Sequence, residues 1–241
     1  MRPASVKRPL LSALLVLTLG ACSNVASTNI KTAGIEAHLV VAADGTGKTK
    51  ATAALNVDTS AVDFVKLSDG DSLVAKTGSQ SQTLTESELL GAVSYAATFD
   101  GADAEGTAYT VSLNRATETS APSSTVTLPA PFSITAPAPA ASFSRANDDL
   151  AVTYASAGTH DSMSWSITGD CILNQSKVLD ADTGSFTVAK ASIKTPSSTT
   201  TENCQVTLTV SRTQVGTLDP AYQGGSILGV QTRTLTFTST P

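Results

Sequence analysis

The sequence predicts an all-β chain built as two tandem β-sandwich domains, and three observations support this. Short segments throughout the chain alternate apolar with polar residues, as half-buried strands do. Turn signals such as Asp69-Gly70 and Asp100-Gly101 separate these segments. Only one short stretch, Thr85–Gly91, has helical character. Many short strands joined by regular turns are typical of a sandwich or a barrel.

The first domain is expected over residues 35–130. It contains no cysteine, so its stability must come from its apolar core alone. Apolar residues at every second position predict a series of strands at residues 36–41, 51–57, 62–67, 72–75, 93–99, 109–113 and 125–128.

A proline cluster marks the expected boundary between the domains. Four prolines lie in the segment LPAPFSITAPAPAASF, and such a density disfavours both helix and central strand. We interpret the segment as a stiff, extended linker. The second domain, residues 131–241, carries expected strands at residues 150–154, 163–167, 186–188, 206–210 and 235–237.

The two halves of the chain contain a faint repeat. YTVSLNR at 109–115 matches VTLTVSR at 206–212 in residue character, and the two segments end in Arg115 and Arg212. A polar loop and a last strand follow each segment. The repeat predicts two copies of one fold, each closing with a long hairpin.

These features together resemble tandem immunoglobulin-like or fibronectin-type domains. The resemblance rests on the strand pattern, on Trp165 in a middle strand and on Cys204 in a late strand. One departure concerns Cys171, which follows Trp165, whereas in antibody-type domains the first cysteine precedes the tryptophan strand. If Cys171 and Cys204 form a disulfide, it should therefore join other strands than in antibody-type domains, with both cysteines facing the core.

The N-terminus has the order of an export signal. Arg2, Lys7 and Arg8 precede an apolar run, 10–19, which is too short to span a membrane. Leu19-Gly20-Ala21-Cys22 then resembles the lipobox of bacterial lipoproteins. The resemblance implies removal of residues 1–21, lipidation of Cys22, and a lipidated tether over residues 22–34 that leads to the first domain. Ser23 favours sorting to an outer membrane, where the cell has one.

An exported chain meets an oxidising space, which bears on the remaining cysteines. Cys171 and Cys204 are therefore expected to form a disulfide. A two-thiol metal site or a reactive thiol is the alternative, but only His160 in this half could assist either one.

The charge balance argues against nucleic acid as a partner. Without residues 1–21 the chain keeps 12 basic against 20 acidic residues, a net charge of −8. Nucleic-acid binding needs a basic face, and none is visible in the sequence.

The stretch AADGTGKT at 42–49 has the loose form of a phosphate-binding loop. That chemistry needs a helix after the loop, with its N–H groups on the phosphate. Here KATAALNVD follows, which alternates as a strand does. We therefore interpret Asp44–Gly47 as a hairpin tip and expect no nucleotide or other cofactor.

Signals for catalysis and metal binding are weak. His160-Asp161-Ser162 are neighbours in sequence, which does not make them a triad, and no G-x-S-x-G motif is present. Asp180 and Asp182 have the spacing of a calcium loop, but its further acidic ligands are missing. The sequence predicts no enzyme and no metal.

The loop VGTLDPAYQGGS at 215–226 is the candidate binding loop. Loops at sandwich ends often bind partners, and an exposed Tyr222 could stack on a glycan or a protein. In the alternative, Tyr222 folds back onto its own sheet under Arg233. The other candidate residues are Asp219, Gly224 and Gly225.

Together these features predict a lipid-anchored protein of the cell envelope. It is expected to act as a non-catalytic binding, adhesion or structural module, attached to the membrane by its lipid and carrying a protein or glycan ligand. The alternative is an envelope carbohydrate-active enzyme or its accessory carbohydrate-binding module.

Overall fold

The protein is all-β, as predicted. A computed structural model describes residues 23–155, 157–159, 161–196 and 201–241. Within these ranges the regular elements are strands and two short 3₁₀ turns, η1 (Ser27–Asn29) and η2 (Thr32–Gly34). No helix in this part of the chain is long and apolar enough to cross a membrane.

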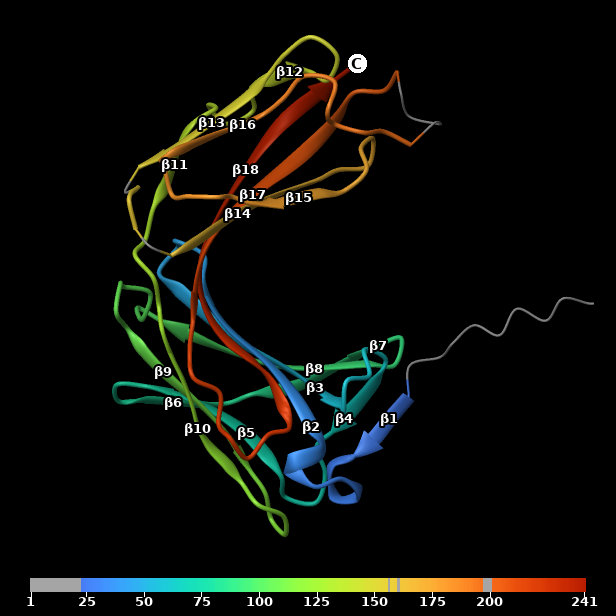
Figure 1. Cartoon of the computed structure of the whole chain (residues 1–241), viewed down its shortest axis with the longest axis vertical. Coiled ribbons are helices and arrows are strands. Elements are labelled where there is room, and N and C mark those ends of the chain that lie inside the picture. The colour runs from blue at the N-terminus through green and yellow to red at the C-terminus, as the bar shows by residue number, and fades with distance from the viewer. Residues whose placement is uncertain (1–22, 156, 160, 197–200) are drawn as a thin grey trace, which may run out of the picture.

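One long sheet runs through the whole molecule (Figure 1). Its strands follow the order β1 (Ser23–Ala26), β4 (Asp63–Lys66), β3 (Lys48–Val57), β2 (Ile35–Ala43), β18 (Gly224–Thr240), β17 (Cys204–Val215), β14 (Ser162–Thr168) and β15 (Gln175–Val178). Off this path, strands pair at the sides: β12 (Ser142–Ser144) with β18, β8 (Ala92–Asp100) with β3, and β7 (Thr85–Leu89) with β8.

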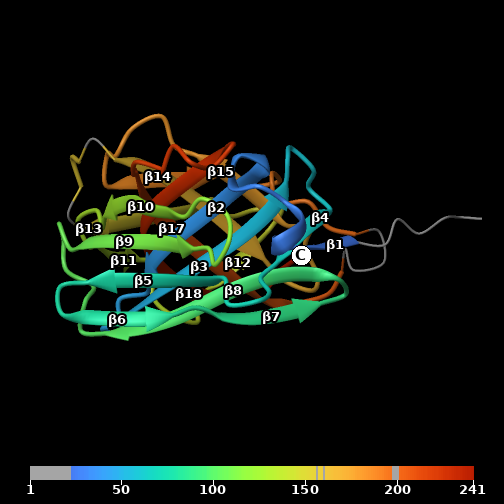
Figure 2. The same cartoon turned by 90° about the horizontal axis from the view of Figure 1, so that it is seen from below.

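Two smaller sheets cover the long sheet from one side. The first covering sheet has the order β10 (Ala121–Thr127), β9 (Ala108–Asn114), β5 (Ser72–Thr77) and β6 (Gln80–Thr83). Figure 2 looks onto this sheet, with β2 and β3 crossing behind it. The second covering sheet has the order β11 (Ser133–Ala136), β13 (Leu150–Ala155) and β16 (Ser185–Val188). Each covering sheet and its part of the long sheet form a β-sandwich.

Each sandwich encloses its own hydrophobic core, because alternate residues of every central strand point inward. In the first core, Phe99 and Tyr109 meet edge to face with ring centroids 5.4 Å apart. In the second core, Trp165 stacks on Phe186 at 5.8 Å. The inward Trp165 that the sequence predicted is confirmed.

Strand β18 belongs to both sandwiches. Residues 224–231 pair in parallel with β2, and residues 228–239 pair with β17 on the other edge of the strand. Accordingly Ile227 lies in the first core and Phe237 in the second. The expected boundary after residue 130 therefore needs a correction, because residues from Tyr222 to 231 pack on the first sandwich. Only a short strand at 235–237 was expected in this stretch, whereas β18 covers all of 224–240.

The repeat that ends in Arg115 and Arg212 corresponds to a closing hairpin and a buried, ion-paired arginine in each sandwich. Both sandwiches close with a hairpin, β9–β10 and β17–β18, as predicted. Each arginine is fully buried and forms an ion pair, Arg115 with Asp71 at 2.7 Å and Arg212 with Asp182 at 2.9 Å. Each arginine also donates to backbone carbonyls in the segment that enters its sandwich. Arg115 donates to the carbonyls of Ser27 and Ile30, and Arg212 donates to the carbonyl of Ala130.

The prediction of a tether over residues 22–34 is wrong for the described residues, because Arg115 and strand β4 hold them on the first sandwich. Residues 23–26 form β1, which pairs in parallel with β4. Ser27 and Thr32 are buried, and the Arg115 guanidinium donates to the Ser27 carbonyl and the Thr32 hydroxyl. Small polar residues resemble a linker in sequence, but here their backbone carbonyls satisfy a buried arginine. Residues from Ser23 onwards are thus part of the first sandwich, and Cys22 lies outside the described residues.

The disulfide is formed as predicted. Cys171 and Cys204 are bonded, with Cα atoms 5.7 Å apart. Cys171 lies in the turn after β14 and Cys204 begins β17, which is the neighbour of β14 in the long sheet. Cys171 is buried and Cys204 packs against the second core. The bridge thus joins the turn after β14 to the neighbouring strand β17 of the same sheet, which departs from antibody-type domains as the sequence indicated.

Two local predictions had different outcomes. Asp44–Gly47 is a hairpin tip between the antiparallel strands β2 and β3, as expected. The stretch Thr85–Gly91 is not helical, because β7 and the start of β8 form a hairpin there. A seven-residue window is too short for helical periodicity to be distinguished from a strand and a turn.

Candidate functional site

The candidate binding loop does not present an aromatic side chain. Tyr222 is 5% exposed and lies in the first core, where burial raises the pKa of its phenol well above the ordinary value. Asp219 is also buried and accepts hydrogen bonds from the backbone and hydroxyl of Ser123. Arg233 does not cover Tyr222 but lies over the Phe132 ring, 5.3 Å from its centroid. The expectation of a binding loop is therefore wrong for these two side chains.

The glycines of the same loop have a packing role. Gly225 has φ of 114°, and a Cβ on it would lie 2.0 Å from the Ala37 carbonyl oxygen. Only glycine lets β18 approach β2 so closely at this point. Gly224 has open space around it and pairs with Glu36 at the start of the β18–β2 ladder. Gly225 thus serves the joint between the sandwiches, whereas Gly224 takes part only through its backbone pairing with Glu36.

The acidic residues of the second half do not assemble a metal site in the described structure. Asp180, Asp182 and Asp161 line one hollow of about 370 Å³. However, the Asp182 carboxylate is buried and accepts hydrogen bonds from Thr159 and Arg212. No group of His, Cys, Asp and Glu that could hold a metal occurs among the described residues. His160 lies outside them.

The outer face of the long sheet lines the concave side of the molecule (Figure 1). Along β18 the residues with odd numbers point to the two cores, and those with even numbers point to this outer face. Since β18 is one strand, the face continues from the first sandwich to the second without a break.

On the second sandwich the centre of the outer face carries hydroxyl side chains in three registered rows. Each row takes one residue from β14, one from β17 and one from β18. We call this set the hydroxyl face, and its members are Ser164, Ser211 and Thr232, then Ser166, Thr209 and Thr234, then Thr168, Thr207 and Thr236. Neighbouring strands are about 4.8 Å apart and alternate residues about 6.7 Å, so the hydroxyls form a lattice.

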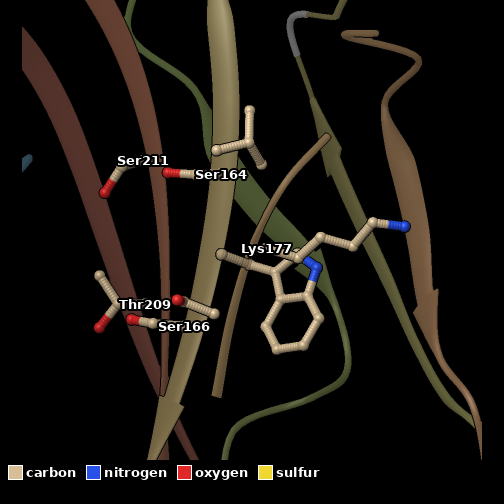
Figure 3. A pocket seen from close by; sticks show the side chains of 8 residues that line it. Ser164, Ser166, Lys177, Thr209 and Ser211 are labelled. Atoms are coloured by element: carbon tan, nitrogen blue, oxygen red, sulfur yellow. The ribbon is translucent and has the colours of Figure 1, made fainter. Parts of the chain in front are cut away.

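Figure 3 shows part of this face in close view. Ser164, Ser166, Thr209 and Ser211 lie together, whereas Lys177 lies on the other side of β14. The four hydroxyl residues and the neighbouring β15 line a hollow of about 390 Å³. Hydroxyl groups both donate and accept hydrogen bonds, so this side of the hollow can hydrogen-bond a polar ligand, and Trp165 and Lys177 complete its lining.

On the first sandwich the outer face is apolar at its centre. Leu228 pairs with Val40 and Val230 with Ala42 across the β18–β2 ladder, and all four are half-buried. We call these four residues the apolar patch. A second hollow, of about 370 Å³, opens beside it where Thr232 meets Ala42, Lys48 and Lys50. The concave side thus offers an apolar patch, a hydroxyl face and two lysines at the edge of a hollow.

Comparisons with known proteins add little beyond the fold. No family model and no curated protein matches the chain. A solved structure described as DIP-gamma IG1+IG2 is similar over 86% of this chain and 98% of its own, with 6% identity and a TM-score of 0.25. A second, described as Dpr11 IG1 bound to DIP-gamma IG+IG2, is similar over 83% and 97%, with 8% identity and a TM-score of 0.23. These scores carry no argument about function.

The concave face was not predicted from the sequence, although the sequence contains part of the pattern that forms it. Residues 207–213 and 232–238 place Thr or Ser at every second position, which indicates an outward face without charge. What the sequence does not reveal is the register that aligns these two series with Ser164 and Ser166 of β14.

Proposed function

We propose that this protein is a lipid-anchored, non-catalytic binding or adhesion module of the cell envelope, and that its concave side is the binding surface. The lipobox at Leu19–Cys22 supports export and lipid attachment to the envelope, with Ser23 favouring the outer membrane. The immunoglobulin-like fold suits display of a surface rather than a reaction. Sharing β18 between the sandwiches favours one continuous surface over two separate ones.

The observation that carries this proposal is the hydroxyl face. Its nine side chains are Ser or Thr, and the cross-strand register places them in rows. Threonine suits a solvent-facing strand, so strand propensity alone accounts for some of the series. An adjoining hollow and the apolar patch make the surface complementary to a neutral partner, which is a glycan or a protein surface rich in hydroxyl and amide groups.

The alternative function, an envelope carbohydrate-active enzyme, has weaker support. It needs carboxylates facing each other across a cleft. Asp182 and Asp219 are held by an arginine and a serine and belong to different sandwiches. An accessory carbohydrate-binding module would use the same hydroxyl face and is one form of the proposed function.

The test is to place charge on the hydroxyl face. Thr209→Arg and Thr234→Arg should weaken binding of the purified protein to immobilised envelope glycans and envelope proteins by about tenfold or more, because an unpaired charge in the contact costs at least ~1.4 kcal/mol. The control is Thr187→Arg on β16, which is exposed in the second covering sheet. Equal loss in all three variants, or no binding by the unaltered protein, would contradict the proposal.

A further inference from the structure

The chain enters the fold beside an exposed hairpin. The Ser23 backbone N–H donates to the Val62 carbonyl at 3.1 Å, and the Asn24 amide donates to Glu88 at 3.3 Å. Glu88 lies in β7, next to the turn that joins β7 to β8. Cys22, the residue that the sequence assigns to the lipid, is therefore one residue before a backbone position fixed against this region. A trans peptide spans about 3.8 Å between Cα atoms, which leaves no room for a spacer.

The tip of this hairpin is apolar and exposed. Leu89 is 74% exposed and Leu90 92% exposed. The large apolar side chain Val62, at 53% exposure, lies beside Ser23. Folding does not explain these side chains, because none of them packs into the first core.

The backbone at the tip makes the choice of leucine more unusual. Leu89 pairs with Ala92, so Leu90 and Gly91 form a two-residue turn, and both have positive φ, 51° and 84°. Turns of this kind favour Asn, Asp or Gly at the first position. A leucine there is strained, and such strain is commonly retained where a residue has a function.

The hairpin tip points the same way as the start of the chain. Lys66 of β4 forms ion pairs with Glu86 at 3.1 Å and with Glu88 at 2.8 Å, while Asn24 contacts Glu88. Following β7 from Glu86 to Leu89 therefore leads back along β1 towards Ser23. Figures 1 and 2 both place β1 and the β7 end of the molecule on the same side.

We propose that Leu89 and Leu90 enter the outer part of the lipid bilayer that carries the Cys22 lipid. The inference rests on the proposed lipid anchor and adds a second, protein-borne contact. Two apolar side chains next to a lipid chain lower the free energy of the docked orientation, because the bilayer removes their surface from water. This contact holds the first sandwich on the membrane and restricts how the concave side is presented.

The depth of the tip can be measured directly. The lipidated protein carrying Leu90→Cys would be labelled with a thiol-reactive environment-sensitive dye and reconstituted in phosphatidylcholine vesicles with brominated acyl chains. Cys171 and Cys204 are bonded to each other, so the new thiol reacts selectively. The matched control is Val178→Cys on β15, a position that is 63% exposed in the second sandwich.

We expect the bromines to quench the dye at position 90 at least about twofold more than the dye at position 178. Equal quenching in protein that floats with the vesicles overturns the tip contact and leaves the lipid anchor intact. Protein that does not float with the vesicles contradicts the anchor and the inference together. Flotation on the same sample thus distinguishes the two failures.

A second variant tests why leucine is present. Leu90→Asn suits the left-handed backbone, so the melting temperature should stay the same or rise. Two lipidated proteins are compared, both with the dye at Leu89→Cys, one with Leu90→Asn and one with Leu90 unchanged. The bromines should quench the dye less in the protein with Leu90→Asn. A lower melting temperature with unchanged quenching would assign the leucine to folding and overturn the proposal.

Discussion

Arg212→Met should destabilise the protein by about 3–5 kcal/mol, which is the usual effect of removing one partner from a buried ion pair. Both side chains of the Arg212–Asp182 pair are fully buried, and the substitution leaves the Asp182 carboxylate without its cation. Arg212 also donates to the Ala130 carbonyl and lies over the Phe132 ring at 5.2 Å. The substitution thus also loosens the segment that enters the second sandwich. Chemical denaturation measures the change in the free energy of unfolding.

The matched control is Arg233→Met, because Arg233 lies over the same Phe132 ring but donates to the Thr232 carbonyl. We expect about 1 kcal/mol or less for it. The double variant Arg212→Met with Asp182→Leu should recover much of the loss, since replacing both members of a buried pair by apolar residues is often neutral. Equal stability of Arg212→Met and Arg233→Met would contradict the assignment.

The same pair gives a pH dependence of known sign. Burial raises the pKa of Asp182, but hydrogen bonds from Thr159 and the charge of Arg212 outweigh it and hold the pKa below its usual value. The ionised carboxylate therefore stabilises the fold above a pH of about 4, and this stability is lost as the pH falls through the lowered pKa. In Arg212→Met the buried Asp182 carboxylate lacks its cation, so it destabilises the folded state most when it is ionised. The stability gap between the two proteins should therefore narrow from pH 7 to pH 4.

Loss of the disulfide should destabilise the second sandwich by roughly 3–4 kcal/mol in the chain-entropy model. The bridge closes a segment with a sequence separation of 33 residues and fixes the start of β17 against the turn after β14. The change is Cys171→Ala with Cys204→Ala, followed by thermal unfolding and hydrogen exchange. Amides of β14 and β17 should lose protection, whereas those of β3 and β8 should keep most of theirs, because the described first core contains no cysteine.

A reducing agent added to the unaltered protein is the control for the alanine substitutions. It should lower the melting temperature by a similar amount and should have no effect on the double variant. Unchanged melting in both cases would show that the bridge contributes nothing to the fold.

The parts of the structure that were predicted correctly depend on local pattern. Alternation predicted the strands around Trp165, and the export signal predicted the Cys171–Cys204 bridge. The repeat at Arg115 and Arg212 indicated two related units. These features need only neighbours in the chain or the chemistry of the compartment.

The parts that were missed depend on contacts between distant residues. Tyr222 was considered for binding because loops at sandwich ends often bind partners, yet it lies in the first core and its loop leads into the pairing with β2, a strand from the other end of the chain. The tether was expected to be free because its residues are small, yet Arg115 holds its carbonyls. The hydroxyl face depends on the register of β14 against β17. No local property of the sequence contains this information.

The most direct test of the account is the chemical state of Cys22 in cells. Cells would be fed an alkyne-tagged fatty acid, and the purified protein would be analysed by mass spectrometry of its N-terminal peptide, with Cys22→Ser as the control. The account predicts that the mature chain begins at Cys22, carries the acyl label and fractionates with membranes, and that the serine variant loses the label. A mature chain with another N-terminus, no label and a place in the soluble fraction would contradict it.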